Sequence, residues 1–207
     1  MPHALSTVVA ASAAVLLGTT TPALAEGGYL EGVLGIAIPV ADDDYAELDE
    51  SLKLGFRLGN GSGATAIELS GDFTPFGRTS TTPLGDVDIG FDRFRLLVGV
   101  RHHIPLDSVA GGTLFLRAGL GGELVRFSAR GDLIGVDLDI EDSDPGLAAE
   151  VGAGLSVPVR GKMYLGFHVA VPLAFHFDED DPSDPEDGDL DYTGVDLDLL
   201  LVLGTRM

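Results

Sequence analysis

The 207-residue sequence contains no cysteine and no tryptophan, and it has few basic residues. Without cysteine the chain forms no disulfide, no zinc–thiolate site and no cysteine nucleophile. Its 12 Lys and Arg residues stand against 33 Asp and Glu residues, which gives a formal net charge of −21. A chain this acidic is a poor partner for nucleic acid, because phosphate binding needs a basic face.

Long apolar runs are also missing, since no segment reaches the roughly eighteen apolar residues of a transmembrane helix. Residues 8–17 form a shorter apolar run, and the small-residue motif Ala23-Leu24-Ala25 follows. This layout predicts a secretory signal peptide over residues 1–25, cleaved after Ala25, and a mature domain over residues 26–207. The alternative is an N-terminal membrane anchor, for which the apolar run is too short to cross about 30 Å of hydrocarbon.

The sequence does have 45% hydrophobic residues and 29 glycines, and the mature part alternates in polarity with period two. In the segment 161–177, for example, Leu165 and Phe167 share one face, whereas Tyr164 and His168 share the other. Strict two-residue alternation over this length is typical of a strand and not of a helix. We predict eight strands, near residues 28–39, 51–59, 64–76, 91–104, 112–128, 146–158, 161–177 and 191–206.

Two arrangements fit strands with one apolar and one polar face. In a soluble barrel the apolar face points inward, whereas in an outer-membrane barrel it meets lipid and the polar face fills the interior. The polar faces favour the membrane barrel, because they carry seven acids and seven bases, and buried charges need partners. The predicted interior charge network consists of Glu31, Lys53, Arg57, Glu68, Asp72, Arg93, Arg95, Arg101, Arg117, Glu123, Glu150, Lys162, Asp196 and Asp198.

The connections between the predicted strands alternate between short and long. The short ones are residues 59–63, 105–111 and 158–161, and the long ones are 40–50, 77–90, 129–145 and 178–190. Counted with their flanking residues, the four long segments hold 23 of the 33 acids and only two bases, Arg78 and Arg130. This pattern predicts an all-β fold, an eight-stranded antiparallel up-and-down transmembrane β-barrel with short periplasmic turns and long acidic extracellular loops.

The acidic segment near residues 177–191 lacks the spacing of an EF-hand calcium loop, so we expect weak, collective binding of divalent cations and no dedicated metal site. Such ions would bridge the loops to lipopolysaccharide. The residues concerned are Asp178, Glu179, Asp180, Asp181, Asp184, Glu186, Asp187 and Asp189. A related pattern, GVDLD, occurs at 135–139 and 194–198, and GDVDIG occurs at 85–90. It marks a duplicated hairpin, strands that extend into the loops, or a chance alternation of Asp with aliphatic residues.

With this alternation and these connections, the sequence resembles the small outer-membrane β-barrel family of Gram-negative bacteria, which includes the transmembrane domain of outer-membrane protein A and the OmpX and OmpW groups. The resemblance is one of architecture and not of a diagnostic motif. Members of the family usually end their last strand on an aromatic residue, and Met207 takes that place here. Aromatic residues near the predicted strand ends are expected to form interfacial girdles: Tyr29, Phe73, Phe76, Phe91, Phe127, Phe175, Phe177 and Tyr192.

An eight-stranded barrel is just wide enough for side chains to fill it. We therefore expect a closed interior and a structural or surface-interaction role in the outer membrane, with lipid and lipopolysaccharide as partners. A narrow or gated channel for small solutes is the alternative. We expect a monomer, no cofactor and no enzymatic activity, since no His-x-Ser pair or nucleophile elbow is present. The sequence offers as candidate bases His102, His103, His168 and His176, and as candidate nucleophiles Ser70 and Ser156.

Overall fold

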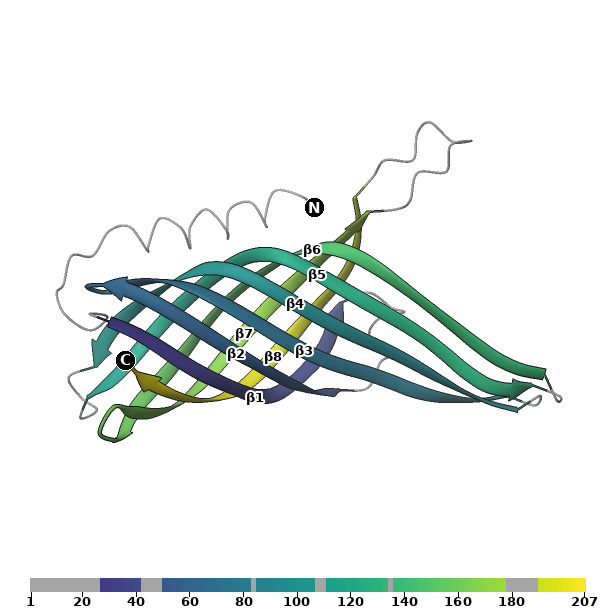
Figure 1. Ribbon diagram of the computed structural model, residues 1–207, viewed down its shortest axis with the longest axis horizontal. Coiled ribbons are helices and arrows are strands. Elements are labelled where there is room, and N and C mark those ends of the chain that lie inside the picture. Colours follow the sequence, from purple (N-terminus) through teal and green to yellow (C-terminus); the bar gives the residue numbers. More distant parts are fainter. Residues whose placement is uncertain (1–26, 42–49, 83–84, 107–110, 134–135, 178–189) are drawn as a thin grey trace.

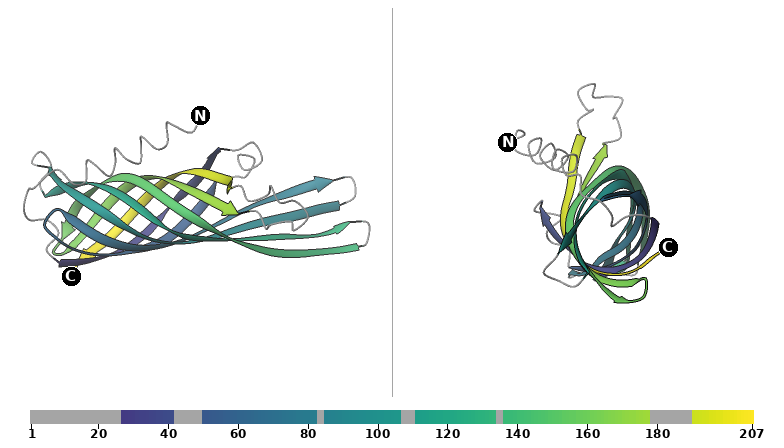
Figure 2. Two further views of the ribbon diagram at one scale, coloured as in Figure 1. Left: turned by 90° about the horizontal axis from the view of Figure 1, so that it is seen from above. Right: turned by 90° about the vertical axis from the view of Figure 1, so that its left-hand side faces the viewer.

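Eight antiparallel strands, each paired with its neighbours in chain order, close into a barrel (Figures 1 and 2). The structure is a computed structural model that describes residues 27–41, 50–82, 85–106, 111–133, 136–177 and 190–207. The strands are β1 (Gly27–Ala41), β2 (Ser51–Ser62), β3 (Thr65–Thr82), β4 (Gly85–Leu106), β5 (Gly112–Leu133), β6 (Val136–Arg160), β7 (Met163–Phe177) and β8 (Leu190–Arg206). The predicted fold class and strand number are confirmed.

The barrel closes where the last strand pairs with the first, from Tyr29 opposite Arg206 to Ala41 opposite Val195. Both ends of the barrel domain therefore lie at one end of the barrel, which we call the terminus end. The β2–β3 and β6–β7 turns lie at the same end. Each contains a glycine in the left-handed backbone region, Gly63 with φ 76° and Gly161 with φ 58°, a conformation that residues with a Cβ rarely adopt.

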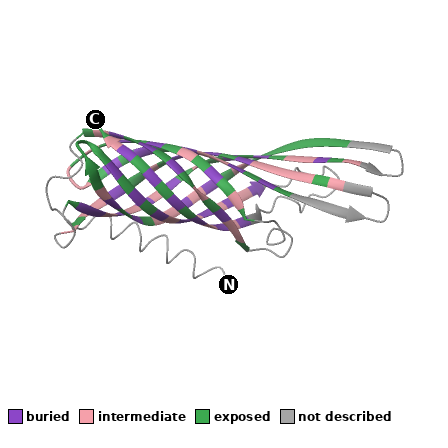
Figure 3. Ribbon diagram, turned by 90° about the horizontal axis from the view of Figure 1, so that it is seen from below, coloured by how far each residue is buried: buried purple, intermediate pink, exposed green. Residues whose placement is uncertain are grey.

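Within the barrel, buried and exposed residues alternate along the strands (Figure 3). The buried set includes most of the charged side chains of the strands, whereas large hydrophobic side chains are exposed on the outside. Leu120, Ile67 and Val98 are 71%, 67% and 60% exposed. A soluble barrel would bury these side chains, so that alternative is wrong; a continuous aliphatic exterior is the surface of a barrel that lies in lipid. Among the described residues there is no helix of the length and apolarity needed to cross a membrane.

Four strands continue well beyond the other end of the barrel, which we call the hairpin end (Figure 1). The β2–β3 pairing stops at Leu54 opposite Phe73, and the β6–β7 pairing stops at Gly146 opposite His176. Beyond these points β3 to β6 remain paired with one another as far as the connections at 83–84 and 134–135. We call residues 75–82, 85–92, 126–133 and 136–143 the protruding sheet.

The protruding sheet corrects the prediction of loops at 77–90 and 129–145. Both segments are mostly strand, because the motifs at 85–90 and 135–139 alternate Asp with aliphatic residues, as strands do. The strands do extend through these motifs, as one of the three interpretations expects. The other two predicted loops, 40–50 and 178–190, lie almost wholly outside the described residues.

Candidate functional site

The candidate site is the charged interior of the barrel. Thirteen of the fourteen residues assigned to the interior charge network have side chains that are buried or nearly so. They form two groups along the barrel axis. The terminus-side cluster consists of Glu31, Arg57, Glu68, Arg101, Arg117 and Glu150. The hairpin-side cluster consists of Lys53, Asp72, Arg93, Arg95, Glu123, Asp196 and Asp198.

Arg101 is the centre of the terminus-side cluster. Its two terminal nitrogens lie 2.6 and 2.7 Å from the carboxylate oxygens of Glu31, and one of them also lies 2.6 Å from Glu68. The guanidinium group stacks between two rings, 4.7 Å from the centre of Tyr29 and 4.4 Å from that of Phe115. A buried arginine is held firmly when bidentate ion pairs and aromatic faces surround its planar group together.

Two tyrosines complete the hydrogen bonding of these carboxylates. The Tyr29 hydroxyl donates to Glu68 at 2.6 Å, and the Tyr164 hydroxyl donates to Glu31 at 2.8 Å. Each ring lies over a glycine of the neighbouring strand, where a Cβ would overlap it: Gly59 under Tyr29 and Gly204 beneath the second ring. The small residues thus make room for the hydroxyls to reach the charges.

Arg117 and Arg57 occupy the middle of the barrel. Arg117 donates to Glu68 and Ser70 and pairs with Glu150. Arg57 lies 2.7 Å from the Nδ1 atom of His168, with longer approaches to the carboxylates around it. The candidate nucleophile Ser70 and the candidate base on β7 are therefore both engaged with arginines of the network.

The hairpin-side cluster links five strands of the barrel wall, β2, β3, β4, β5 and β8. The Lys53 ammonium lies 3.1 Å from Asp72 and 2.6 Å from Asp198. Arg93 pairs with Asp196, and Arg95 donates to Glu123 at 2.8 Å. The cluster has four acids and three bases, whereas the terminus-side cluster has three of each. The excess of one acid over the bases therefore lies in the cluster nearer the hairpin end.

Apolar side chains and close packing separate the two clusters. Val33, Leu200 and Val202 form a buried apolar group, and Leu97 is buried on β4 between Arg95 and Arg101. A cavity lined by Val33, Leu200 and residues of both clusters has a volume of only about 10 Å³. This is about the smallest space that holds a single water molecule, so this cavity has room for no more than about one.

Lys162 departs from the predicted network. It is exposed and lies in the β6–β7 turn, because β7 begins one residue later, at Met163. The alternation that placed it on the interior face holds only inside the strand. Without Lys162 the interior network contains six bases and seven acids, an excess of one acid. The imidazole of His176 lies 3.3 Å from Glu123, which belongs to the cluster with the extra acid.

The aromatic residues also departed from expectation. Tyr29 and Phe76, predicted for the interfacial girdles, are buried inside the barrel; Phe76 lies 4.9 Å beneath the Arg93 guanidinium. These two residues were predicted for the girdles because they lie near strand ends. Their positions in the two-residue alternation place them on the inward face, and this alternation predicts their location correctly. Tyr164, which the prediction did not include in the network, shares that alternation. The predicted cation-binding residues between Asp178 and Asp189 lie outside the described residues.

The comparisons with known proteins concern architecture. No protein-family model and no curated protein matches the sequence. The solved structures similar to this chain are outer-membrane β-barrel proteins. They include Neisserial surface protein A, with 14% identity and a TM-score of 0.47 over 87% of this chain and 97% of that one.

Two further solved structures come from Pseudomonas aeruginosa. The N-terminal β-barrel domain of OprF has 12% identity and a TM-score of 0.43 over 86% of this chain and 97% of that one. The outer membrane protein OprG has 13% identity and a TM-score of 0.40 over 87% of this chain and 96% of that one.

Proposed function

We propose that the chain is a non-enzymatic integral outer-membrane barrel whose interior is closed and whose role is structural or exerted through the surface it presents beyond the membrane. The observation that carries this proposal is the filled interior. Six buried bases and seven buried acids are interlocked across it, and the cavity between the clusters has a volume of about 10 Å³. A permanent aqueous path needs far more space than that.

The proposed location in the outer membrane is supported by the apolar outer surface of the barrel and by the signal peptide predicted at the N-terminus. An aliphatic surface on every strand requires lipid, and a closed barrel satisfies its backbone hydrogen bonds there without exposed edges. The signal peptide predicted over residues 1–25 would direct export. Mass spectrometry of the protein purified from an outer-membrane fraction is expected to give a mature chain that begins at Glu26.

A surface role is supported by the protruding sheet. Beyond the barrel, β6 carries the exposed acids Asp139, Glu141, Asp142 and Asp144. The strand has a neighbour on one side only from Val136 to Pro145, since β7 joins at Gly146. An acidic surface held on four paired strands would attract basic partners at a distance from the membrane.

Single-channel conductance tests the closed interior. The mature chain, refolded in detergent and inserted into a planar bilayer, is expected to give no discrete current steps. A double variant, Arg57→Ala with Arg117→Ser, enlarges the cavity between the clusters and is expected to conduct, which shows that the assay detects inserted barrels. Reproducible steps from the unaltered, folded protein would contradict the proposal and favour a narrow or gated channel for small solutes.

The partners proposed for the loops are divalent cations and lipopolysaccharide. Nine carboxylates lie within residues 177–191, and hard cations favour several oxygen ligands at once. Weak collective binding would bridge this segment to lipid phosphates around a monomeric barrel. If a chelator leaves the thermal unfolding of the protein in lipopolysaccharide-containing vesicles unchanged, this bridging does not occur.

A further inference from the structure

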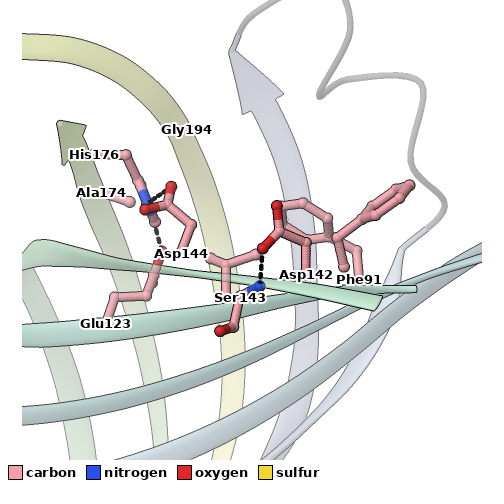
Figure 4. Close-up of a pocket in the computed structure, with 10 residues that line it drawn as sticks. Phe91, Glu123, Asp142, Ser143, Asp144, Ala174, His176 and Gly194 are labelled. Atoms are coloured by element: carbon pink, nitrogen blue, oxygen red, sulfur yellow. Dashed lines mark hydrogen bonds and ion pairs between the residues drawn. The ribbon is translucent and has the colours of Figure 1, made fainter. Parts of the chain in front are cut away.

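A pocket opens at the mouth of the barrel, where the protruding sheet begins (Figure 4). Its volume is about 300 Å³, which is within the range of small-molecule sites. Phe91, Val125 and Phe127 form its apolar wall, and Glu123 and His176 lie at its polar end. We call it the mouth pocket.

The pocket exists because the barrel wall divides at this height. The β6–β7 pairing begins at Gly146 opposite His176. Beyond that point β6 pairs only with β5 in the protruding sheet, whereas β7 ends at Phe177, where it is still paired with β8. On the β7–β8 side two small residues, Ala174 and Gly194, face each other next to an irregularity in the register. Their lack of bulk leaves the space in front of the two phenylalanine rings open.

Carboxylates converge on the polar end of the mouth pocket. Imidazole nitrogens of His176 lie 2.6 Å from Asp144 and 3.3 Å from Glu123, so one ring is shared between two acids. Figure 4 shows the imidazole between them. Asp142 lines the pocket too, and the hairpin-side cluster beneath it has one acid more than it has bases. With Asp142 and Asp144 added, this cluster has six acids against three bases and His176, so the net charge around the pocket is negative whether or not the imidazole is protonated.

Aromatic faces beside carboxylates are the surroundings that proteins use for organic ammonium groups, through ring quadrupoles and charge together. A metal ion fits less well, because within the described parts of the chain no group of three or more His, Asp or Glu side chains has the geometry to hold one. An anion at the polar end would face Glu123 and Asp144, with the His176 imidazole already held between them.

We propose that the mouth pocket binds an amphipathic organic cation, an amine carried on an apolar body. The ammonium group lies against Glu123 and Asp144, and the apolar body lies against Phe91, Val125 and Phe127. This proposal does not depend on whether the barrel is closed, because a closed barrel can bind a ligand at its mouth and an open barrel can have no such site. Conductance and ligand binding therefore test the two independently.

The test is isothermal titration calorimetry on the full mature chain in dodecyl maltoside, which contains no amine. Three probes share one ring and differ in charge: phenethylamine, phenethyl alcohol and phenylpropionate. We expect saturable binding of the amine at one site, binding of the alcohol weaker by about tenfold or more, and no measurable binding of the carboxylate. Equal affinity for amine and alcohol, or no saturable binding of the amine, would overturn the proposal.

Variants locate the site. Asp144→Asn keeps a hydrogen-bond acceptor for His176 but removes the charge, and it is expected to weaken amine binding by about tenfold. Phe127→Ala is expected to weaken amine and alcohol alike. Asp92→Asn is the matched control, because Asp92 follows Phe91 on the opposite face of β4, and it should change neither affinity. Amine binding that Asp144→Asn leaves unchanged would refute the assignment, with circular dichroism showing that each variant is folded.

Discussion

Arg101 of β4 pairs with Glu31 of β1 through both terminal nitrogens, at 2.6 and 2.7 Å, across the interior of the barrel. Both side chains are about 1% exposed. Removing one partner of such a pair leaves the other charge buried without compensation, which is more damaging than the loss of the contact itself. The relationship makes Arg101 a sensitive position of the terminus-side cluster.

We expect Arg101→Ala to lower the free energy of unfolding by about 3–5 kcal/mol. Urea unfolding of the protein in lipid vesicles measures this change. Arg126→Ala is the control, because Arg126 pairs with Glu141 where both side chains are about half exposed; its effect should stay below about 1 kcal/mol. Equal, small effects of the two substitutions would mean that Arg101 is not buried among its partners.

Two lysines that the sequence pattern treats alike should behave differently. Lys53 is buried between Asp72 and Asp198, whereas Lys162 is exposed in a turn. Lys53→Met is expected to destabilise the barrel by about 3–5 kcal/mol, since two acids lose their cation. Lys162→Met should change stability by less than about 0.5 kcal/mol. Similar losses in urea unfolding would place both lysines inside.

A methyl group at Gly59 should displace the ring of Tyr29. The Cβ of an alanine there would overlap the ring, and overpacking typically costs about 1–3 kcal/mol. The hydroxyl would also lose its hydrogen bond to Glu68. Gly32→Ala is the matched control, because a Cβ at Gly32 meets nothing within 4 Å. Thermal unfolding should separate the two variants; a Gly59→Ala protein as stable as Gly32→Ala would show that the ring lies elsewhere.

The protruding sheet should loosen in acid. Hydrogen bonding from Arg126, together with the positive charges of Arg126 and Arg130, lowers the pKa of the Glu141 carboxyl below its usual value. The stabilising contribution of a group with a lowered pKa is complete above its unfolded pKa and is lost as the pH falls through the folded one. The protection of amides in residues 126–133 and 136–141 against exchange, relative to their intrinsic rates, is therefore expected to fall as the pH drops below the ordinary carboxyl range.

Glu141→Gln provides the control for this pH dependence. The variant lacks the titrating carboxyl, so amide exchange in the protruding sheet, corrected for intrinsic rates, should already be faster at neutral pH and should change little in acid. The same acid response in both proteins would assign it to other groups.

Much of the barrel follows from alternation alone. The two-residue alternation places Arg95 and Arg101 on one face of β4 and Leu96 and Val98 on the other. The balance of acids and bases on the polar faces indicates that the apolar face meets lipid, and together these two observations assign each residue to the inside or the outside of the barrel. The same reasoning failed at Lys162, because alternation carries no information on where a strand begins. It also underestimated β3 to β6, whose acidic alternating ends were read as loops because acids are unusual in strands.

The pairings inside the barrel were beyond prediction from the sequence. Alternation brings Lys53 to the interior, but its distance to Asp198 depends on how the strands are staggered when the sheet closes. The mouth pocket was missed for the same reason. It depends on the height at which β7 separates from β6, and neither Ala174 nor Gly194 has a side chain that suggests a site.

The long separation of the interior partners has a kinetic consequence. Lys53 and Asp198 are 145 positions apart, and Arg93 and Asp196 are 103 apart. Neither pair can form until β8, the last strand of the chain, has reached β1. Contacts between distant segments form slowly, because the chain must lose the entropy of a large loop before they stabilise it. The Lys53–Asp72 and Arg95–Glu123 pairs join neighbouring strands and can form early, whereas the ion pairs to Asp196 and Asp198 are completed only when the last strand closes the barrel.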